Sequence, residues 1–235
     1  MSTRPQKRER GCRLKPLLWN FDPSVTDHVT AHAVEVHGVR VQDTGKAFAE
    51  LVELGRTLSE RHQGTTIGEI EGIAEARRLY KAFGVDPTRT RPSSEALLRR
   101  CIKGQELYRI NEAVDVCNWV SLEFLLPTGL YDRGRIVGDT AVVRVGQEGE
   151  EFAGIRKGPV HLAGRLCVSD DESAFGSPTS DSLRTSVTED TTNLAAIVFA
   201  PRGIEAERLE NAGAALASRM ALYCSGSVAL DELVD

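Results

Sequence analysis

Residues 110–123, INEAVDVCNWVSLE, predict a helix that is apolar on almost every face. Asn111, Asp115 and Asn118 interrupt it, and their i, i+4 and i+7 spacing places them on one narrow stripe. Amide and carboxylate groups are costly to bury without partners. We therefore predict that Asn111 and Asp115 bond to the backbone of neighbouring loops.

The composition is that of an ordinary globular protein, with 235 residues of which 41% are hydrophobic and 27% charged. The sequence shows no apolar run long enough to span a bilayer and no secretory signal, which predicts a cytoplasmic protein without a membrane partner. The basic stretch at 1–15 predicts a disordered tail. Because no linker or repeat divides the remainder, residues 16–235 are expected to form a single domain.

The cysteines and histidines give no metal-binding pattern. The five cysteines are scattered and contain no CxxC pair, which favours reduced, mostly buried thiols. His28 and His32 have helical spacing, but the alternating stretch 29–41, VTAHAVEVHGVRV, predicts a strand instead. Phosphate-binding loops, nucleophile elbows and dinucleotide fingerprints are also missing, so we predict neither a metal nor a cofactor.

Helical periodicity predicts four further elements. A helix capped by Asp43 or Thr44 extends to about residue 62, and a second covers 67–84 and ends at Gly84. A short helix is capped by Ser93 or Ser94 and terminated near Gly104, and the last helix covers 204–223.

Strands are predicted near 31–41, at 140–146 and 150–155 as a hairpin, within 161–170, and at 193–201. Most of the predicted helices precede these strands, and one helix follows them. This order predicts an α+β fold with a mixed, largely antiparallel sheet flanked by helices.

Two polar segments stand out as candidate ligand contacts. The loop 89–95, RTRPSSE, opens a basic region that could contact nucleic-acid phosphates or form a solvated surface; its candidate contacts are Arg89, Arg91, Arg99, Arg100 and Lys103. The segment 180–193, SDSLRTSVTEDTTN, precedes an apolar strand. It is either a ligand rim or a surface turn whose hydroxyl groups bond their own backbone.

Residues 109–132, RINEAVDVCNWVSLEFLLPTGLYD, resemble the signature of the B3/B4 domain of the bacterial phenylalanyl-tRNA synthetase beta subunit. The matching positions are Ile110, Asn111, Val114, Asp115, Asn118, Val120, Leu122, Glu123, Pro127, Tyr131 and Asp132. A second resemblance lies in 186–201, SVTEDTTNLAAIVFAP, through Val187, Thr188, Thr191 or Thr192, and Asn193. Together the resemblance covers about residues 75–205.

The resemblance implies an editing module, which hydrolyses the ester of a tRNA that carries the wrong amino acid. The chain has no room for a synthetase core, so it looks like a stand-alone B3/B4-like domain that edits in trans. One substrate class that the stand-alone group implies is arginine tRNA mischarged with canavanine. The predicted partner is therefore the aminoacylated 3′ end of tRNA, and not DNA.

Residue by residue, the family's pocket asparagine falls on Asn118. A pocket histidine of the synthetase form falls on Gly129, which leaves that role vacant. A glutamate that precedes the Val-Thr segment in the synthetase form has no match in the neighbourhood of 181–185. These departures put the original tyrosine specificity in doubt.

Hydrolysis of an activated ester can proceed mainly by orientation of water and substrate, without a dedicated nucleophile. The candidate catalytic residues are two orienting amides and two hydroxyl groups, Asn118, Asn193, Thr185 and Thr188. Asp115 or Asp181 could bind the substrate ammonium or a guanidinium-like side chain. The remaining candidate substrate contacts are Ser182, Arg184 and Gly129.

Two other functions remain open from the sequence. The chain could be a non-catalytic module that binds tRNA or an aminoacyl-adenosine, or it could bind free amino acids. Salt-sensitive tRNA binding without hydrolysis would favour the non-catalytic module. Thermal stabilisation by free amino acids but not by tRNA would favour the amino-acid binder.

Overall fold

The strand predicted at 193–201 is confirmed as β9 (Asn193–Pro201), one of the two inner strands of a four-stranded sheet. In the computed structural model, which describes residues 14–155 and 158–235, β9 pairs antiparallel with β2 (Val29–His37) and β3 (Thr128–Asp132). β10 (Ser227–Val234) joins the far edge of β2. The tail predicted at 1–15 lies outside the described residues except for its last two.

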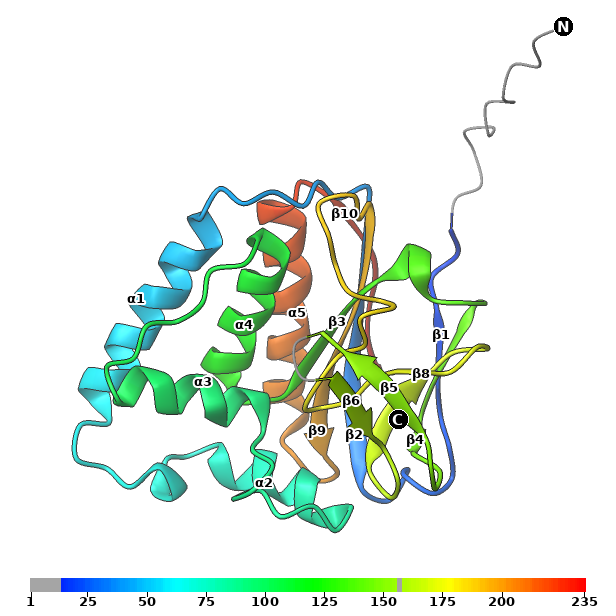
Figure 1. Ribbon diagram of the computed structural model, residues 1–235. Helices are drawn as coiled ribbons and strands as arrows, with labels where there is room; N and C mark the ends of the chain where they lie inside the picture. Colours follow the sequence, from blue (N-terminus) through cyan, green and yellow to red (C-terminus); the bar gives the residue numbers. More distant parts are fainter. Residues whose placement is uncertain (1–13, 156–157) are drawn as a thin grey trace, which may run out of the picture.

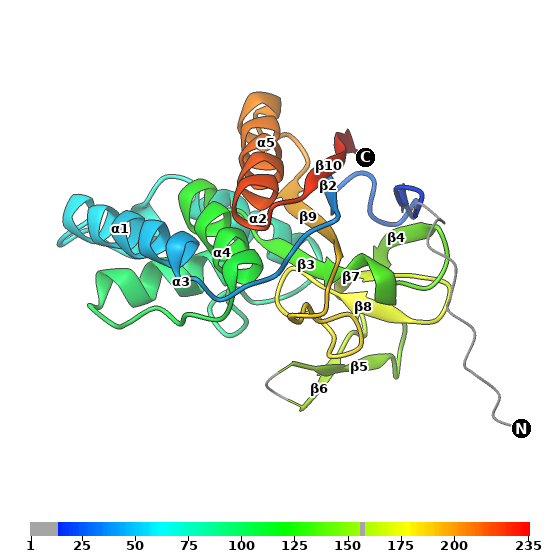
Figure 2. The ribbon, with the colours of Figure 1, turned by 90° about the horizontal axis from the view of Figure 1, so that it is seen from above.

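Three layers build the molecule (Figures 1 and 2). Helices α1 (Lys46–Arg61), α3 (Ser93–Ile102), α4 (Glu112–Phe124) and α5 (Ala206–Tyr223) lie on one side of the β9 sheet. On its other side lies a second sheet of β1 (Leu18–Phe21), β4 (Thr140–Val145), β7 (Leu166–Ser169) and β8 (Ala174–Gly176). The pairing of β1 with β4 is parallel and the other pairings antiparallel, so the predicted α+β fold with mixed, largely antiparallel sheets is confirmed.

The middle position of β9 explains its continuous apolar sequence. Ala196 and Val198 face α4 and α5, whereas Ile197 and Phe199 face the second sheet. A strand covered on both faces needs apolar residues at every position rather than at alternate ones. The described helices include none with the length and apolar character of a membrane-spanning helix.

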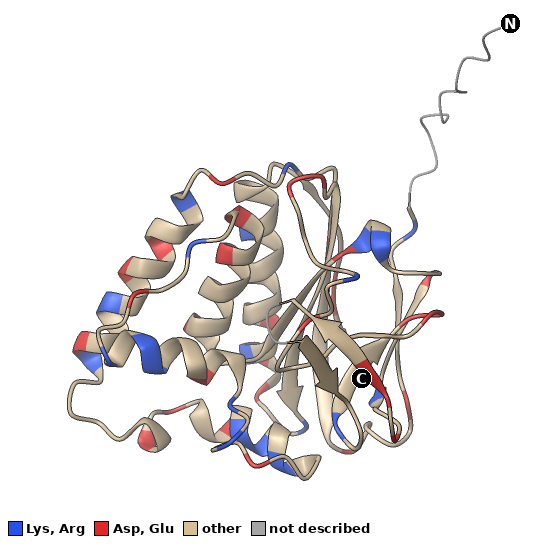
Figure 3. Ribbon diagram, in the orientation of Figure 1, with Lys and Arg blue, Asp and Glu red and all other residues tan. Residues whose placement is uncertain are grey.

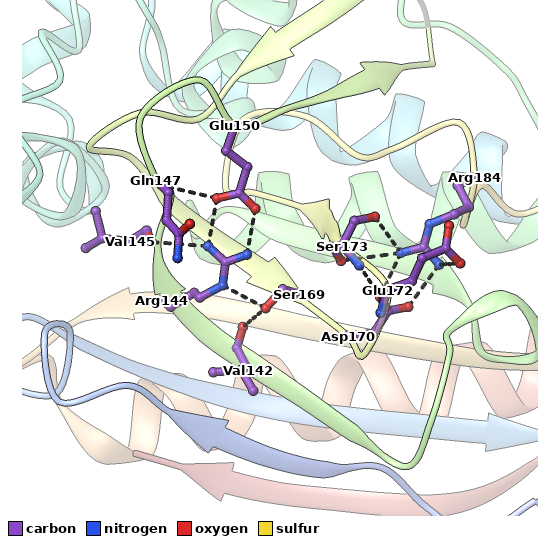
Figure 4. A network of polar contacts seen from close by, with 10 residues as sticks. All are labelled: Val142, Arg144, Val145, Gln147, Glu150, Ser169, Asp170, Glu172, Ser173 and Arg184. Carbon is purple, nitrogen blue, oxygen red and sulfur yellow. Dashed lines mark hydrogen bonds and ion pairs between the residues drawn. The ribbon is translucent and has the colours of Figure 1, made fainter.

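The hairpin predicted from 140–146 and 150–155 is wrong. β4 instead pairs with β7, and β5 (Glu151–Gly154) pairs with β6 (Gly158–His161). Gly146 permits this arrangement, because a Cβ there would collide with the backbone carbonyl of Leu162, which crosses beside it. Arg144 closes the turn by a bidentate ion pair with Glu150 (2.6 and 2.8 Å; Figure 4).

The predicted caps of two helices are wrong. The N-terminus of α1 is capped by Glu112, whose carboxylate accepts hydrogen bonds from the backbone of Lys46 (3.0 Å) and Ala47 (2.8 Å). Thr44 donates to the same carboxylate and accepts only a long hydrogen bond from the backbone of Lys46 (3.5 Å). Ser93 and Ser94 lie inside α3 and make no cap bond.

The second predicted helix is shorter than 67–84. It divides into a 3₁₀ turn (Ile67–Glu69) and α2 (Ile73–Ala82), because Gly72 between them adopts a left-handed conformation with φ of 94°. Four of the five cysteines lie among the described residues, and all four are free and buried, as predicted.

Candidate functional site

The polar stripe of α4 divides between structure and cavity, although Asn111 bonds within its own helix rather than to a neighbouring loop as predicted. Asn111 caps the helix, and its Oδ1 accepts a hydrogen bond from the backbone of Val114 (3.0 Å). Asp115 Oδ1 accepts one from the backbone of Ile110 (3.2 Å), which ties the preceding loop to the helix. Asn118, one turn further on, lines a cavity.

This cavity, of about 390 Å³, lies between α4, β3 and the segment that follows β8. We call it the ester cavity, after the ester substrate that the family resemblance leads us to expect. One wall consists of Val114, Cys117, Asn118 and Ser121 from α4 with Thr128 and Leu130 from β3; the other walls consist of Ser93, Ile110, Gly154, Ile155, residues 177–181, Ser186 and Val187. Hydroxyl, amide and apolar groups thus surround a space large enough for an aminoacyl group.

Asp181 is the charged residue among the described residues that line the ester cavity. Its Oδ1 is buried and lacks a well-formed hydrogen bond within the described chain. Burial raises the pKa of the Asp181 carboxyl to about 7, although the Leu130 backbone N–H and the Tyr131 hydroxyl favour its ionised form. Near neutral pH the group is therefore divided between its acid and base forms, as a proton acceptor requires.

Tyr131 explains why position 129 carries no side chain. The Tyr131 ring is fully buried and stands edge-on to Phe175, with centroids 4.8 Å apart. A Cβ at Gly129 or at Gly176 would fall well inside van der Waals contact of the Tyr131 hydroxyl. The Tyr131 hydroxyl therefore occupies the space that a side chain at Gly129 would need.

The predicted hydroxyl groups Thr185 and Thr188 are not among the described residues that line the ester cavity. The buried Thr185 donates from Oγ1 to the carbonyl of Phe175 (3.5 Å). The backbone N–H of Thr188 donates to Thr191 Oγ1 (3.0 Å), and Thr191 in turn donates to Asp132 (2.8 Å). Thr185, whose carbonyl accepts from the backbone of Asp132 (2.8 Å), and the backbone of Thr188 thus hold the 185–191 loop against the end of β3, whereas the Thr188 hydroxyl is buried without a hydrogen-bond partner among the described residues.

Asn193 also lies away from Asn118. Its Oδ1 accepts a hydrogen bond from the backbone of Gly38 (3.2 Å), where it supports the end of β2. Leu130, on the cavity wall, pairs with Ala196 of β9. Asn193 lies three residues from Ala196 on this strand, which at about 3.3 Å per residue is a distance of roughly 10 Å.

Ser182 and Arg184 hold the loop between β7 and β8 rather than the cavity wall. Arg184 forms a bidentate ion pair with the buried carboxylate of Asp170 (2.9 Å for each bond) and also bonds to the carbonyl of Ser173 (Figure 4). Ser182 Oγ accepts from the backbone of Arg184 (3.1 Å). Local sequence patterns could not indicate this pairing, because Asp170 belongs to a different segment.

Figure 3 shows that Lys and Arg are frequent on α2, α3 and the loop between them. The candidate tRNA-contact residues differ in how exposed their side chains are and in whether these side chains already bond within the chain. Arg99 bonds to the fully buried Glu95 (3.0 Å), and Arg100 donates to the carbonyl of Glu106 while its guanidinium stacks on a tyrosine ring. Arg89 is 90% exposed, and Arg91 and Lys103 are exposed as well.

Sequence reasoning missed the segment 177–180, SPTS, which forms one wall of the ester cavity. Its Ser, Thr and Pro content is typical of a tight turn, and the Ser177 hydroxyl does donate to the carbonyl of Ser180 (3.0 Å). The one sequence feature that could have indicated this wall is that the segment directly precedes Asp181, a candidate substrate contact. No group of three His, Cys, Asp or Glu side chains suited to a metal ion occurs in the described part of the chain.

Comparison with known proteins agrees with this fold. The structure is similar to an N-terminal fragment of the phenylalanyl-tRNA synthetase beta subunit from Pyrococcus horikoshii, with a TM-score of 0.50 and 15% sequence identity, which shows the fold alone. The match covers 92% of this chain and 52% of that one, so this chain spans about half the fragment's length. A comparison with curated proteins gives no match. The model of the B3/4 domain matches residues 75–225, well over half of the sequence, and the chain therefore belongs to the B3/4 domain family.

Proposed function

We propose that this protein is an aminoacyl-tRNA deacylase, which hydrolyses in trans the ester of a mischarged tRNA. The observation that carries the proposal is the ester cavity, in which the Asp181 carboxyl and the Asn118 amide line one space. Family membership supports a relation to a tRNA synthetase domain. Arginine tRNA charged with canavanine is the first substrate to test, since it is the substrate class that the resemblance to the stand-alone group implies.

The cavity contains groups that match the steps of ester hydrolysis. The ionised Asp181 accepts a proton from water as the water oxygen attacks the ester carbon. The Asn118 side-chain N–H groups can stabilise the negative charge that develops on the carbonyl oxygen. The bond from carbon to the ribose oxygen then breaks, and that oxygen takes the proton, which releases free amino acid and intact tRNA.

Replacement of Asn118 by Ala tests the site directly. We expect a loss of about 10²–10³-fold in kcat, the typical effect of removing one oxyanion donor, with little change in thermal stability because the residue is only partly buried. Deacylation of a panel of purified aminoacyl-tRNAs, including canavanyl-tRNA, measures the effect. Salt-sensitive tRNA binding without hydrolysis of any member of the panel would contradict the proposal and favour a non-catalytic module.

The basic loop 89–95 gives a separate test of the tRNA partner. Replacement of both Arg89 and Arg91 by Ala should weaken tRNA binding and lower the slope of log affinity against log salt by roughly 1 for each phosphate that is no longer neutralised. The matched control is Arg56→Ala, because Arg56 is exposed on α1 and its bonds go to Glu53 and Glu60. An equal loss in the control variant would contradict a specific role for the loop.

A further inference from the structure

A second cavity, of about 220 Å³, lies behind one wall of the ester cavity. We call it the rear cavity. The segment 177–180 lines both cavities. Tyr80 of α2 fixes this segment from the rear side, because its hydroxyl donates to the carbonyl of Pro178 (2.8 Å) and accepts from Thr179 (2.9 Å). A ligand in the rear cavity is therefore separated from the ester cavity by a single stretch of chain.

The rear cavity is lined mostly by apolar and flat groups. Leu79, Tyr80, Phe83 and Leu166 contribute aliphatic and aromatic surface, and Phe83 is held edge-on by the ring of His28. Cavities that bind drug-sized ligands measure roughly 300–1,000 Å³. A smaller apolar space with aromatic walls suits one planar ring system, and nucleobases bind proteins by such stacking.

The surroundings of the rear cavity are basic. Thr90 lines the cavity, and the exposed Arg89 and Arg91 flank it in sequence. Arg165, also exposed, lines the cavity from the segment before β7. His161 lines it as well and pairs with Glu151 (3.0 Å). An apolar space with Arg165 on its lining and two exposed arginines next to Thr90, one of which lies 3.8 Å from Asp86, matches an aromatic base joined to a phosphate.

We propose that the rear cavity binds a nucleobase of the single-stranded 3′ end of tRNA, with an adjoining phosphate at the arginines. The inference rests on the proposed function for the identity of the nucleotide. It adds a binding site that orients the substrate while its ester lies on the other side of segment 177–180. The terminal base and the base before it are the two sources of this ligand chemistry.

Calorimetric titration with AMP, CMP and ribose 5-phosphate tests the rear cavity on the full chain. We expect saturable binding of AMP or CMP, and the tighter of the two identifies the base. Ribose 5-phosphate should bind at least tenfold more weakly, because it cannot stack. Binding of ribose 5-phosphate as tight as that of both nucleotides would overturn the proposal.

The variant Phe83→Ala should weaken nucleotide binding about tenfold, the effect of removing one stacking partner. It should also raise KM for an aminoacyl-tRNA more than it lowers kcat. Phe48→Ala is the matched control, because Phe48 is likewise partly buried but packs between α1 and α3, away from the rear cavity. Arg165→Glu, at an exposed position, repeats the test should Phe83→Ala fail to fold.

The outcomes separate this inference from the proposed function. If the protein binds a nucleotide, Phe83→Ala weakens that binding and no tRNA is deacylated, the proposed role of the rear cavity is supported and the proposed deacylase function is contradicted. Deacylation that is unchanged in both Phe83→Ala and Arg165→Glu, with no nucleotide binding, overturns the rear cavity alone.

Discussion

Asp181→Asn lowers kcat for deacylation about 10²–10⁴-fold, the usual contribution of a positioned general base. Asparagine preserves the shape of the side chain but cannot accept a proton from the attacking water. In the wild type we expect kcat to rise with pH through about 7, because the proposed mechanism uses the ionised carboxyl and burial raises the pKa of Asp181 to about 7. Single-turnover deacylation between pH 5 and 9 measures both effects. A loss of less than tenfold would contradict the assigned role.

The same substitution should stabilise the protein at alkaline pH. The pKa of Asp181 is about 7 in the folded state against 3.8 for the unperturbed group, so the folded state binds more protons between these values. Stability therefore falls as pH rises from about 4 to 7 and is level above 7. For this partly exposed residue we expect Asp181→Asn to gain on the order of 2 kcal/mol at pH 8 in urea unfolding. If Asp181→Asn gave no gain in stability, the Asp181 carboxyl would be better solvated than its raised pKa implies.

Asp115→Asn decides between the two carboxylates that the sequence offered. Burial also raises the pKa of Asp115, to about 6, but Asp115 is not among the described residues that line the ester cavity. Its replacement should lessen the fall in stability between pH 4 and 6, to which Asp181 also contributes, and leave the pH profile of kcat centred near 7. A pH profile of kcat that shifts in Asp115→Asn and is unchanged in Asp181→Asn would show that Asp115, and not Asp181, is the general base.

Local sequence patterns were enough to predict the helix and the strand that are buried on nearly all sides. β9 is buried on both faces and α4 on most of its surface, so each is a continuous apolar run that periodicity detects. The family resemblance of residues 109–132, rather than the spacing of the stripe, assigned Asn118 to a pocket wall, and Asn118 does line the ester cavity.

Pairings between distant segments could not be read in this way. Glu112 caps α1 across a long stretch of sequence, and Arg184 is bound by Asp170, so a local cap and a free pocket arginine were both reasonable expectations. The turn at Gly146 likewise depends on Leu162, which no local hairpin rule includes. The ester cavity is formed by separate segments of the chain, and its opposing wall at 177–180 therefore appeared only in the fold.

Gly129→Ala should destabilise the protein by about 1–3 kcal/mol, as overpacking of a closed core does. The new methyl group would meet the hydroxyl of Tyr131, and the hydroxyl cannot retreat because Gly176 is equally close on its other side. Displacement of the Tyr131 ring would also move the hydroxyl that faces Asp181. We therefore expect a shift of the kcat pH profile as well as a lower midpoint of urea unfolding.

The double variant Gly129→Ala with Tyr131→Phe distinguishes this collision from a general effect of the added methyl group. Loss of the hydroxyl removes the nearest atom, whereas the ring carbon that carried it remains 2.7 Å from the ideal Cβ. The double variant should therefore recover part of the stability lost in Gly129→Ala, with a coupling energy of about 0.5–3 kcal/mol. Additive losses from the two substitutions would show that the Tyr131 hydroxyl does not fill the space beside Gly129, and the vacant histidine position would then need another explanation.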